Sequence, residues 1–177
     1  MTRIETSFHE AGHAVIAHLL GKPEYGAIVH GAGSGTAGTG DLSTPCKLED
    51  YTPKTTGDCH LNTLLSGNDG WFEVFKDMTI TAAGYAAASM ATNQPVIVLT
   101  GPDRISVASA IGLLFPEAAQ DFETHRAAES LAIARARYLL HTNWPSVERV
   151  ALALDTRGRL SAEEVAELMR TPATGTE

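Results

Sequence analysis

The feature that most constrains this chain is the sequence His9-Glu10-Ala11-Gly12-His13 near its start. Apolar residues recur around it at helical spacing, which predicts a helix from about Ser7 to Leu20, ended by Gly21. In such a helix His9 and His13 lie about 40° apart around the axis, so both imidazoles can reach one ion. Imidazoles and a carboxylate on an otherwise apolar helix need something to satisfy them. The sequence therefore predicts a metal-binding helix.

The pattern HExxH is typical of zinc hydrolases. Two neutral imidazoles and a third protein ligand hold Zn²⁺, and an open position keeps a water whose pKa falls to about 7. Glu10 projects beside the histidines, where it can take the proton of that water and deliver it to a leaving amine. HExxH fixes only three of its five positions, so a chance match is the alternative. The apolar flanks Phe8 and Val15 favour the metal site.

Spacing alone leaves the third ligand open. His18 lies about 140° from His13 around the same helix and points away. The longer motif HExxHxxGxxH is absent, because Ile16 and Leu19 occupy its Gly and last His positions. The candidates further along the chain are Asp41, Asp50, Asp58, His60, Glu73, Asp77 and Asp103.

Composition favours one domain and excludes some partners. The chain has 177 residues, 44% hydrophobic and 19% charged, which suits a single domain over 1–170 with a flexible tail over 171–177. Its net charge of -8 disfavours nucleic acid and anionic membranes as partners. We find no run long enough to span a membrane and no secretory signal, so we expect a cytoplasmic protein. Cys46 and Cys59 lack CxxC spacing and predict reduced thiols.

The remaining pattern predicts an α+β fold that is mostly α-helical, with a small β element beside the metal helix and a C-terminal helical bundle. Ala27 to His30 is a strand-like run, Gly31 to Gly40 a flexible glycine-rich turn, and Leu42 to Pro45 a second short strand. Helices are expected over 60–65, 71–91, 101–115, 118–141 and 145–154, and after the capping box that begins at Ser161. The aromatic residues Trp71, Phe72, Tyr138 and Trp144 are interpreted as core packing.

The glycine-rich stretch contains GxGxxG over 33–38, but no helix follows it to hold a pyrophosphate. We interpret it as a mobile turn beside a substrate path. If the preceding strand is an exposed sheet edge, a substrate peptide can pair with its backbone. The expected substrate-binding residues are Ala27, Ile28, Val29, His30 and Gly31, with His30 a candidate for holding the developing oxyanion.

The segment FHEAGHAVIAHLLG, residues 8–21, resembles the metal helix of FtsH-type zinc metallopeptidase domains. Weaker similarities follow in the family's order and cover nearly the whole chain. They are AIVHGAGSGTAGTGDLSTP at 27–45, TAAGYAAASM at 81–90, TGPDRISVASAIGLL at 100–114, and ARARYLLHTNWPSVERVALAL with LSAEEVAELM near the end.

The resemblance implies that Asp103 is the third zinc ligand and that the substrate is unfolded or flexible polypeptide. The family's Arg and two Glu in the motif AGRAAEE are Tyr85, Ala88 and Ser89 here. A phosphate loop GxxxxGK followed by Ser or Thr is missing, so we expect a peptidase that is ATP-independent on its own. A homo-oligomer or a separate unfoldase are its expected partners. The alternatives are a catalytically weak zinc-binding regulatory module and a dedicated regulator-cleaving HExxH peptidase whose third ligand is not Asp103.

Overall fold

The computed structural model describes residues 1–31, 34–38, 70–94, 99, 101–115 and 121–170. The expected strand at 42–45, the expected helix at 60–65, both cysteines and the tail at 171–177 lie outside these residues. Within them, no helix is both long and apolar enough to cross a membrane.

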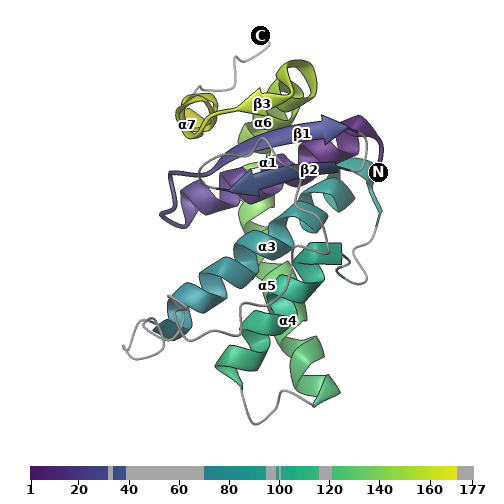
Figure 1. Cartoon of the computed structure of the whole chain (residues 1–177), viewed down its shortest axis with the longest axis vertical. Coiled ribbons are helices and arrows are strands. Elements are labelled where there is room, and N and C mark those ends of the chain that lie inside the picture. Colours follow the sequence, from purple (N-terminus) through teal and green to yellow (C-terminus); the bar gives the residue numbers. More distant parts are fainter. Residues whose placement is uncertain (32–33, 39–69, 95–98, 100, 116–120, 171–177) are drawn as a thin grey trace.

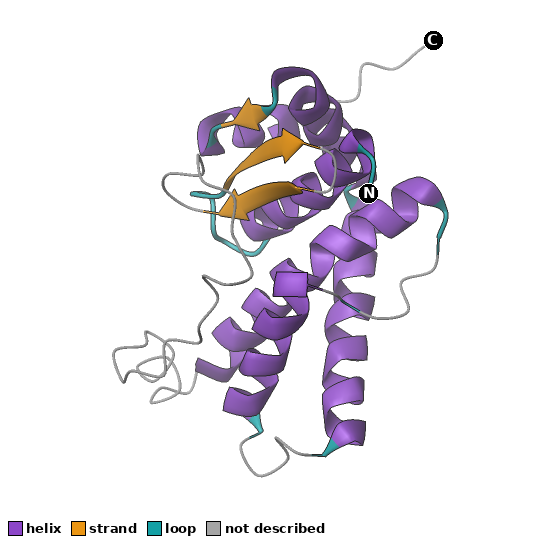
Figure 2. Cartoon of the chain, turned by 45° about the vertical axis from the view of Figure 1, so that its right-hand side comes forward, coloured by secondary structure: helices purple, strands orange, loops and turns teal. Residues whose placement is uncertain are grey.

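Six helices and three short strands make up the described part of the chain, which confirms the mostly helical α+β class (Figure 1). The helices are α1 (Arg3–Leu19), α3 (Gly70–Thr92), α4 (Gly101–Leu114), α5 (Phe122–Thr142), α6 (Trp144–Arg157) and α7 (Ala162–Arg170). The strands are β1 (Gly26–Gly31), β2 (Ser34–Gly38) and β3 (Arg159–Leu160). The strands gather at one end of the molecule, and α4 and α5 extend toward the other (Figure 2).

Helix α1 lies at the centre, in contact with α3, α6, β1 and β2. It begins four residues before the predicted cap, because Thr2 and Glu5 form a capping box in which each side chain bonds the other residue's backbone N–H. Ser7 is inside the helix, where its hydroxyl donates to the Arg3 carbonyl. The apolar stripe is as expected, with Ala11, Ala14, Val15 and Ile16 fully buried.

Helices α1 and α3 cross with their backbones in close approach. A Cβ placed on Gly12 would lie 2.5 Å from the Ala83 carbonyl oxygen and 2.7 Å from the Ala87 Cβ. Both alanines of α3 that lie against Gly12, Ala83 and Ala87, are fully buried. Small side chains on both helices therefore place the backbone of α3 directly against the face of α1 that carries the histidines.

The sheet has the order β2-β1-β3, with β1 antiparallel to both neighbours. Residues Ser34–Gly38 form a strand, so interpreting them as a flexible turn was wrong. Their backbones pair with β1 from Gly26 to Gly31, and this pairing orders a segment whose small side chains give little strand signal. The two-residue strand β3 was not predicted.

Three aromatic residues expected in the core are exposed: Tyr138 at 72%, Trp71 at 51% and Phe72 at 47%. Helix α5 buries Ala132, Ala136 and Leu140, one stripe at helical spacing. Tyr138, two residues before Leu140, therefore points away from that stripe. Trp144 is half-buried and its ring stacks on Phe8, with ring centroids 5.6 Å apart.

Candidate metal centre

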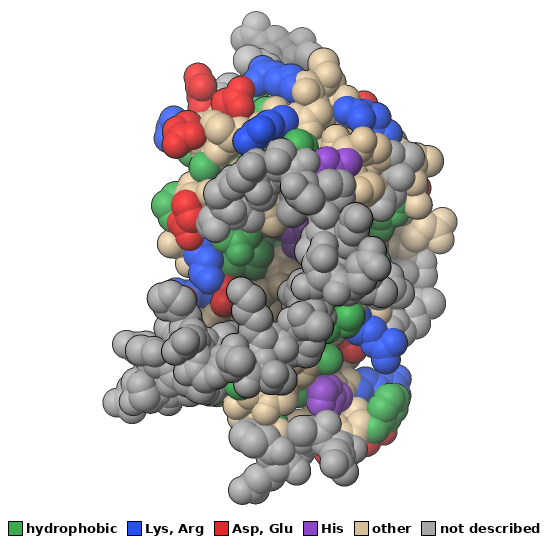
Figure 3. Space-filling model, viewed as in Figure 1, with side chains coloured by type: hydrophobic (Ala, Val, Ile, Leu, Met, Phe, Trp, Pro, Cys, Tyr) green, Lys and Arg blue, Asp and Glu red, His purple; other side chains and the backbone are tan. Residues whose placement is uncertain are grey.

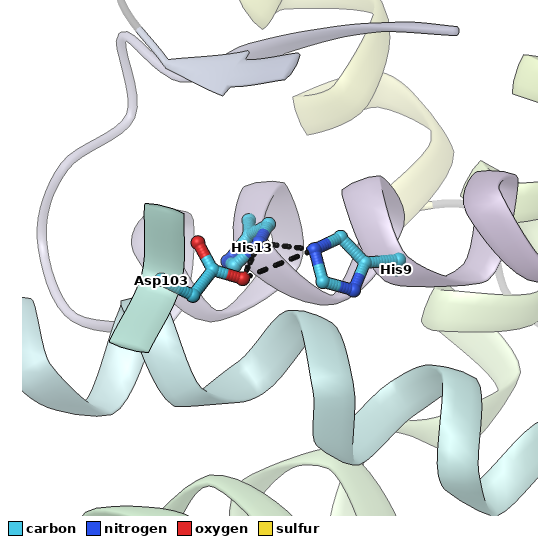
Figure 4. A group of neighbouring side chains, drawn as sticks. All are labelled: His9, His13 and Asp103. Carbon is cyan, nitrogen blue, oxygen red and sulfur yellow. Dashed lines mark hydrogen bonds and ion pairs between the residues drawn. The ribbon is translucent and has the colours of Figure 1, made fainter. Parts of the chain in front are cut away.

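Two helices bring His9, His13 and Asp103 together (Figure 4). The Nε2 atoms of His9 and His13 are 3.1 Å apart. Oδ2 of Asp103 lies 3.2 Å from Nε2 of His9 and 3.5 Å from Nε2 of His13. One ligand atom from each residue lies within 4.8 Å of the other two, and no other such group of three His, Cys, Asp or Glu occurs in the described part of the chain.

Asp103 reaches the histidines from the first turn of α4, where the sequence places it. Two other candidates for the third ligand are engaged elsewhere, since Glu73 pairs with Lys76 and Asp77 pairs with Lys22. The remaining candidates are Asp41, Asp50, Asp58 and His60, which lie outside the described residues. His18 points away as expected, with its Nε2 2.8 Å from the Tyr25 carbonyl oxygen.

The Ile80 carbonyl fixes the tautomer of neutral His13. Its oxygen lies 2.8 Å from Nδ1 of His13, and because a carbonyl can only accept, Nδ1 donates. The Nε2 lone pair of the neutral ring therefore faces His9 and Asp103. Ligand histidines in metal sites are commonly oriented by this kind of outer hydrogen bond.

Gly84 of α3 leaves room for both imidazoles. A Cβ at this position would lie 2.3 Å from Nε2 of His13 and 2.8 Å from Cε1 of His9, closer than atoms in contact can be. Ile80 and Gly84 are four residues apart and so share one face of α3. The role of Gly84 depends on the packing of α3 on α1, so no pattern within the sequence reveals it.

Burial and charge compete at the three side chains, which are 10% to 20% exposed. Burial alone would lower the pKa of His13, but Asp103 and then Glu10 raise this pKa to about 9. Burial alone would raise the pKa of Asp103, but His13 and His9 outweigh it and hold this pKa well below its usual range. Two imidazoles and a carboxylate whose ligand atoms converge form the donor set of a three-ligand zinc site, so these residues fit the ion.

Glu10 lies beside these three side chains and is only 4% exposed. Burial raises the pKa of its carboxyl group, while the neighbouring His9 and His13 oppose the increase. Strand β2 crosses directly over this side chain, and a Cβ on Gly35 would lie 2.6 Å from Oε1 of Glu10. Glycine at position 35 therefore lets a strand backbone reach the carboxylate.

The expected substrate-binding strand does not have a free edge. Ala27 and Ile28 of β1 pair with β2 on one side and β3 on the other, and the Val29 N–H donates to the Gly158 carbonyl. Nε2 of His30 is buried with no hydrogen-bond partner among the described residues, and Gly31 pairs with Ser34. The exposed edge that peptide binding along β1 requires is therefore absent at Ala27 and Ile28, because the short strand β3 pairs with them on the second side. Among the described residues, β2 is at one edge of the sheet and lies next to Glu10.

In Figure 3, histidine atoms are partly visible near the middle of the face seen in Figure 1. No protein-family model matches the chain, and no curated protein matches it significantly. A function must therefore be inferred from the residues of the site.

Proposed function

We propose that this chain is a zinc-dependent metallopeptidase in which His9, His13 and Asp103 hold the ion and Glu10 is the general base. The observation that carries the proposal is the convergence of three donor atoms from α1 and α4 beside a buried carboxylate. The donor set, the HExxH spacing and the resemblance to FtsH-type zinc peptidases all favour the same chemistry.

A zinc ion bound by these residues would supply a Lewis acid that polarises the scissile carbonyl and acidifies water. Glu10 would accept the proton of the attacking water and transfer it to the leaving nitrogen. A pKa raised by burial suits this exchange, because a base works best when its pKa approaches the working pH. The hydrogen bond to the Ile80 carbonyl would keep the His13 ring in its ligating orientation while the reaction proceeds.

The substrate we propose is an extended segment of unfolded or flexible polypeptide. Such a segment can pair with the outer edge of β2 through its main chain, which gives binding with little side-chain selectivity. We therefore place the substrate path along Ser34–Gly38 instead of β1, because β2 passes over Glu10 and has no second strand partner among the described residues. Folded substrates would need a separate unfoldase or an oligomeric assembly.

Peptide hydrolysis and zinc content together test the proposal. The purified chain, loaded with one equivalent of zinc, is incubated with casein and with unstructured fluorogenic peptides. Wild type should cleave them, Glu10→Gln should retain zinc and lose about 10²-fold to 10⁴-fold in rate, and Asp103→Ala should lose zinc affinity. A wild-type chain that binds no zinc would overturn the proposal.

A catalytically weak zinc-binding module is the second candidate. The observation that favours it is the replacement of the family's charged residues by Tyr85, Ala88 and Ser89. Zinc bound by both wild type and Glu10→Gln, with cleavage by neither, would support this module. Cleavage of one protein but not of casein or peptides would instead support a dedicated regulator-cleaving peptidase.

A further inference from the structure

The two histidines of the centre are oriented by different contacts. Nδ1 of His13 donates to the Ile80 carbonyl, but Nδ1 of His9 is buried and has no hydrogen-bond partner among the described residues. The second nitrogen of a ligand histidine usually donates to an oxygen, and this bond sets the plane of the ring. Among the described residues, a contact other than a hydrogen bond to Nδ1 must therefore fix the plane of the His9 ring.

Aromatic packing encloses that ring. Tyr85 lies against His9 with ring centroids 4.9 Å apart and an interplanar angle of 82°. His13 packs on His9 at 4.6 Å and 84°, and Gly84 lies beneath both imidazoles. Perpendicular ring pairs at this separation are favourable and directional, because the edge of one ring meets the face of the other.

Tyr85 also approaches the helix that carries the third ligand. A Cβ on Gly101, the first residue of α4, would lie 3.9 Å from the Tyr85 hydroxyl oxygen. Gly101 precedes Asp103 by two residues and has a φ of +62°. One side chain on α3 therefore lies against a ligand of α1 and next to the start of α4.

We propose that Tyr85 is a positioning residue of the metal centre, whose ring holds the His9 imidazole in its ligating plane in place of an outer hydrogen bond. The proposal rests on the metal site of the proposed function, but not on peptidase activity. The family that the chain resembles has Arg at this position, so the arrangement belongs to this chain. The proposal assigns this positioning role to the aromatic ring of Tyr85 and not to its hydroxyl group.

Metal binding by position-85 variants tests this role. Zinc affinity is measured by competition with a chromophoric chelator, and ligand geometry by the visible spectrum of the cobalt-substituted protein. Tyr85→Phe keeps the ring and should stay within about twofold of wild type with an unchanged cobalt spectrum. Tyr85→Leu should bind zinc about 10-fold to 100-fold more weakly and alter the cobalt bands, the range expected for losing an outer contact to a ligand. Tyr138→Leu, at an exposed tyrosine of α5, is the matched control and should bind as wild type.

Each outcome separates this inference from the proposed function. If wild type binds no zinc, the metal site itself fails. If wild type binds zinc and Tyr85→Leu binds it equally well, or if Tyr85→Phe is as weak as Tyr85→Leu, only the role of the Tyr85 ring is overturned. Should Tyr85→Leu not fold, as judged by circular dichroism, Tyr85→Met takes its place. In zinc-loaded wild type, nuclear Overhauser contacts between the ring protons of Tyr85 and His9 are expected, and their absence would overturn the inference without any variant.

Discussion

Replacing Gly84 with alanine should damage zinc binding far more than it damages the fold. The added methyl group would lie 2.3 Å from Nε2 of His13 and 2.8 Å from Cε1 of His9. Ordinary contact begins at 3.4 Å, so His13 would have to move by about 1.1 Å. It cannot do so freely, because its Nδ1 is bonded to the Ile80 carbonyl at 2.8 Å.

The effect on stability is the sum of two opposing contributions. Alanine inside a helix is more favourable than glycine by about 0.5–1 kcal/mol. Overpacking a filled interior costs about 1–3 kcal/mol. We expect metal-free Gly84→Ala to be destabilised by up to about 2.5 kcal/mol and to remain folded. Zinc affinity should fall at least about 100-fold, since both imidazoles are displaced.

The assay is chelator competition for zinc beside urea unfolding of the metal-free protein. Gly112→Ala in α4 is the matched control, because a Cβ there would meet no atom within 4 Å. This control should gain about 0.5–1 kcal/mol in unfolding free energy and keep wild-type zinc affinity. Wild-type zinc affinity in folded Gly84→Ala would refute the placement of the two imidazoles against α3.

Three further predictions concern Glu10 and protonation. Gly35→Ala should lower peptidase activity and leave zinc affinity unchanged, because the three atoms nearest the new Cβ, at 2.6–2.8 Å, all belong to Glu10. Zinc binding at pH 7 should release close to one proton, measured by titration calorimetry in buffers of different ionisation enthalpy, since the pKa of His13 is about 9 without metal. The His13–Asp103 pair should increase the free energy of unfolding of the metal-free protein most near pH 5–6. Because the pKa of His13 is raised, its contribution to the free energy of unfolding is complete below its ordinary pKa of 6.5 and is lost as pH rises through 9. Because the pKa of Asp103 is lowered, its contribution to the free energy of unfolding is lost as pH falls below about 4. Urea unfolding of wild type and Asp103→Asn over this pH range measures the difference.

Each of these predictions has an outcome that contradicts it. Full activity in Gly35→Ala would show that β2 does not lie against the side chain of Glu10. Enthalpies that do not depend on the buffer would show that His13 is already neutral at pH 7. A difference between wild type and Asp103→Asn that grows toward pH 10 would mean that the carboxylate does not stabilise a protonated His13.

The sequence could predict the helix that carries His9 and His13 and the first-turn position of Asp103 because both are local patterns. His9 and His13, four residues apart, lie on the same face of a helix. Gly101 and Pro102 indicate the start of a helix, and Asp103 falls in its first turn. The ligating role of Asp103 came from a resemblance, since spacing left seven candidates. That Asp103 meets both histidines is a fact of the structure, and zinc binding there remains a prediction.

The surroundings of the site could not be predicted in the same way. Gly84, Tyr85 and the Ile80 carbonyl act through the packing of α3 on α1, and no periodicity within either helix reveals which residues face each other. Strand β2 has small side chains, and its order depends on pairing with β1. Strand β1 lacks the exposed edge that a substrate path along it requires, because β3, a two-residue strand more than 120 positions later in the sequence, pairs with it.

The close crossing at Gly12 has a consequence for how the centre forms. Glycine lets the backbones of α1 and α3 come into direct contact there, and any larger side chain would force the helices apart. The packing of these two helices therefore sets the surroundings of both imidazoles. A cation entering such a preorganised centre would have little entropy to lose in arranging the histidines, and tight binding would need no rearrangement of the core.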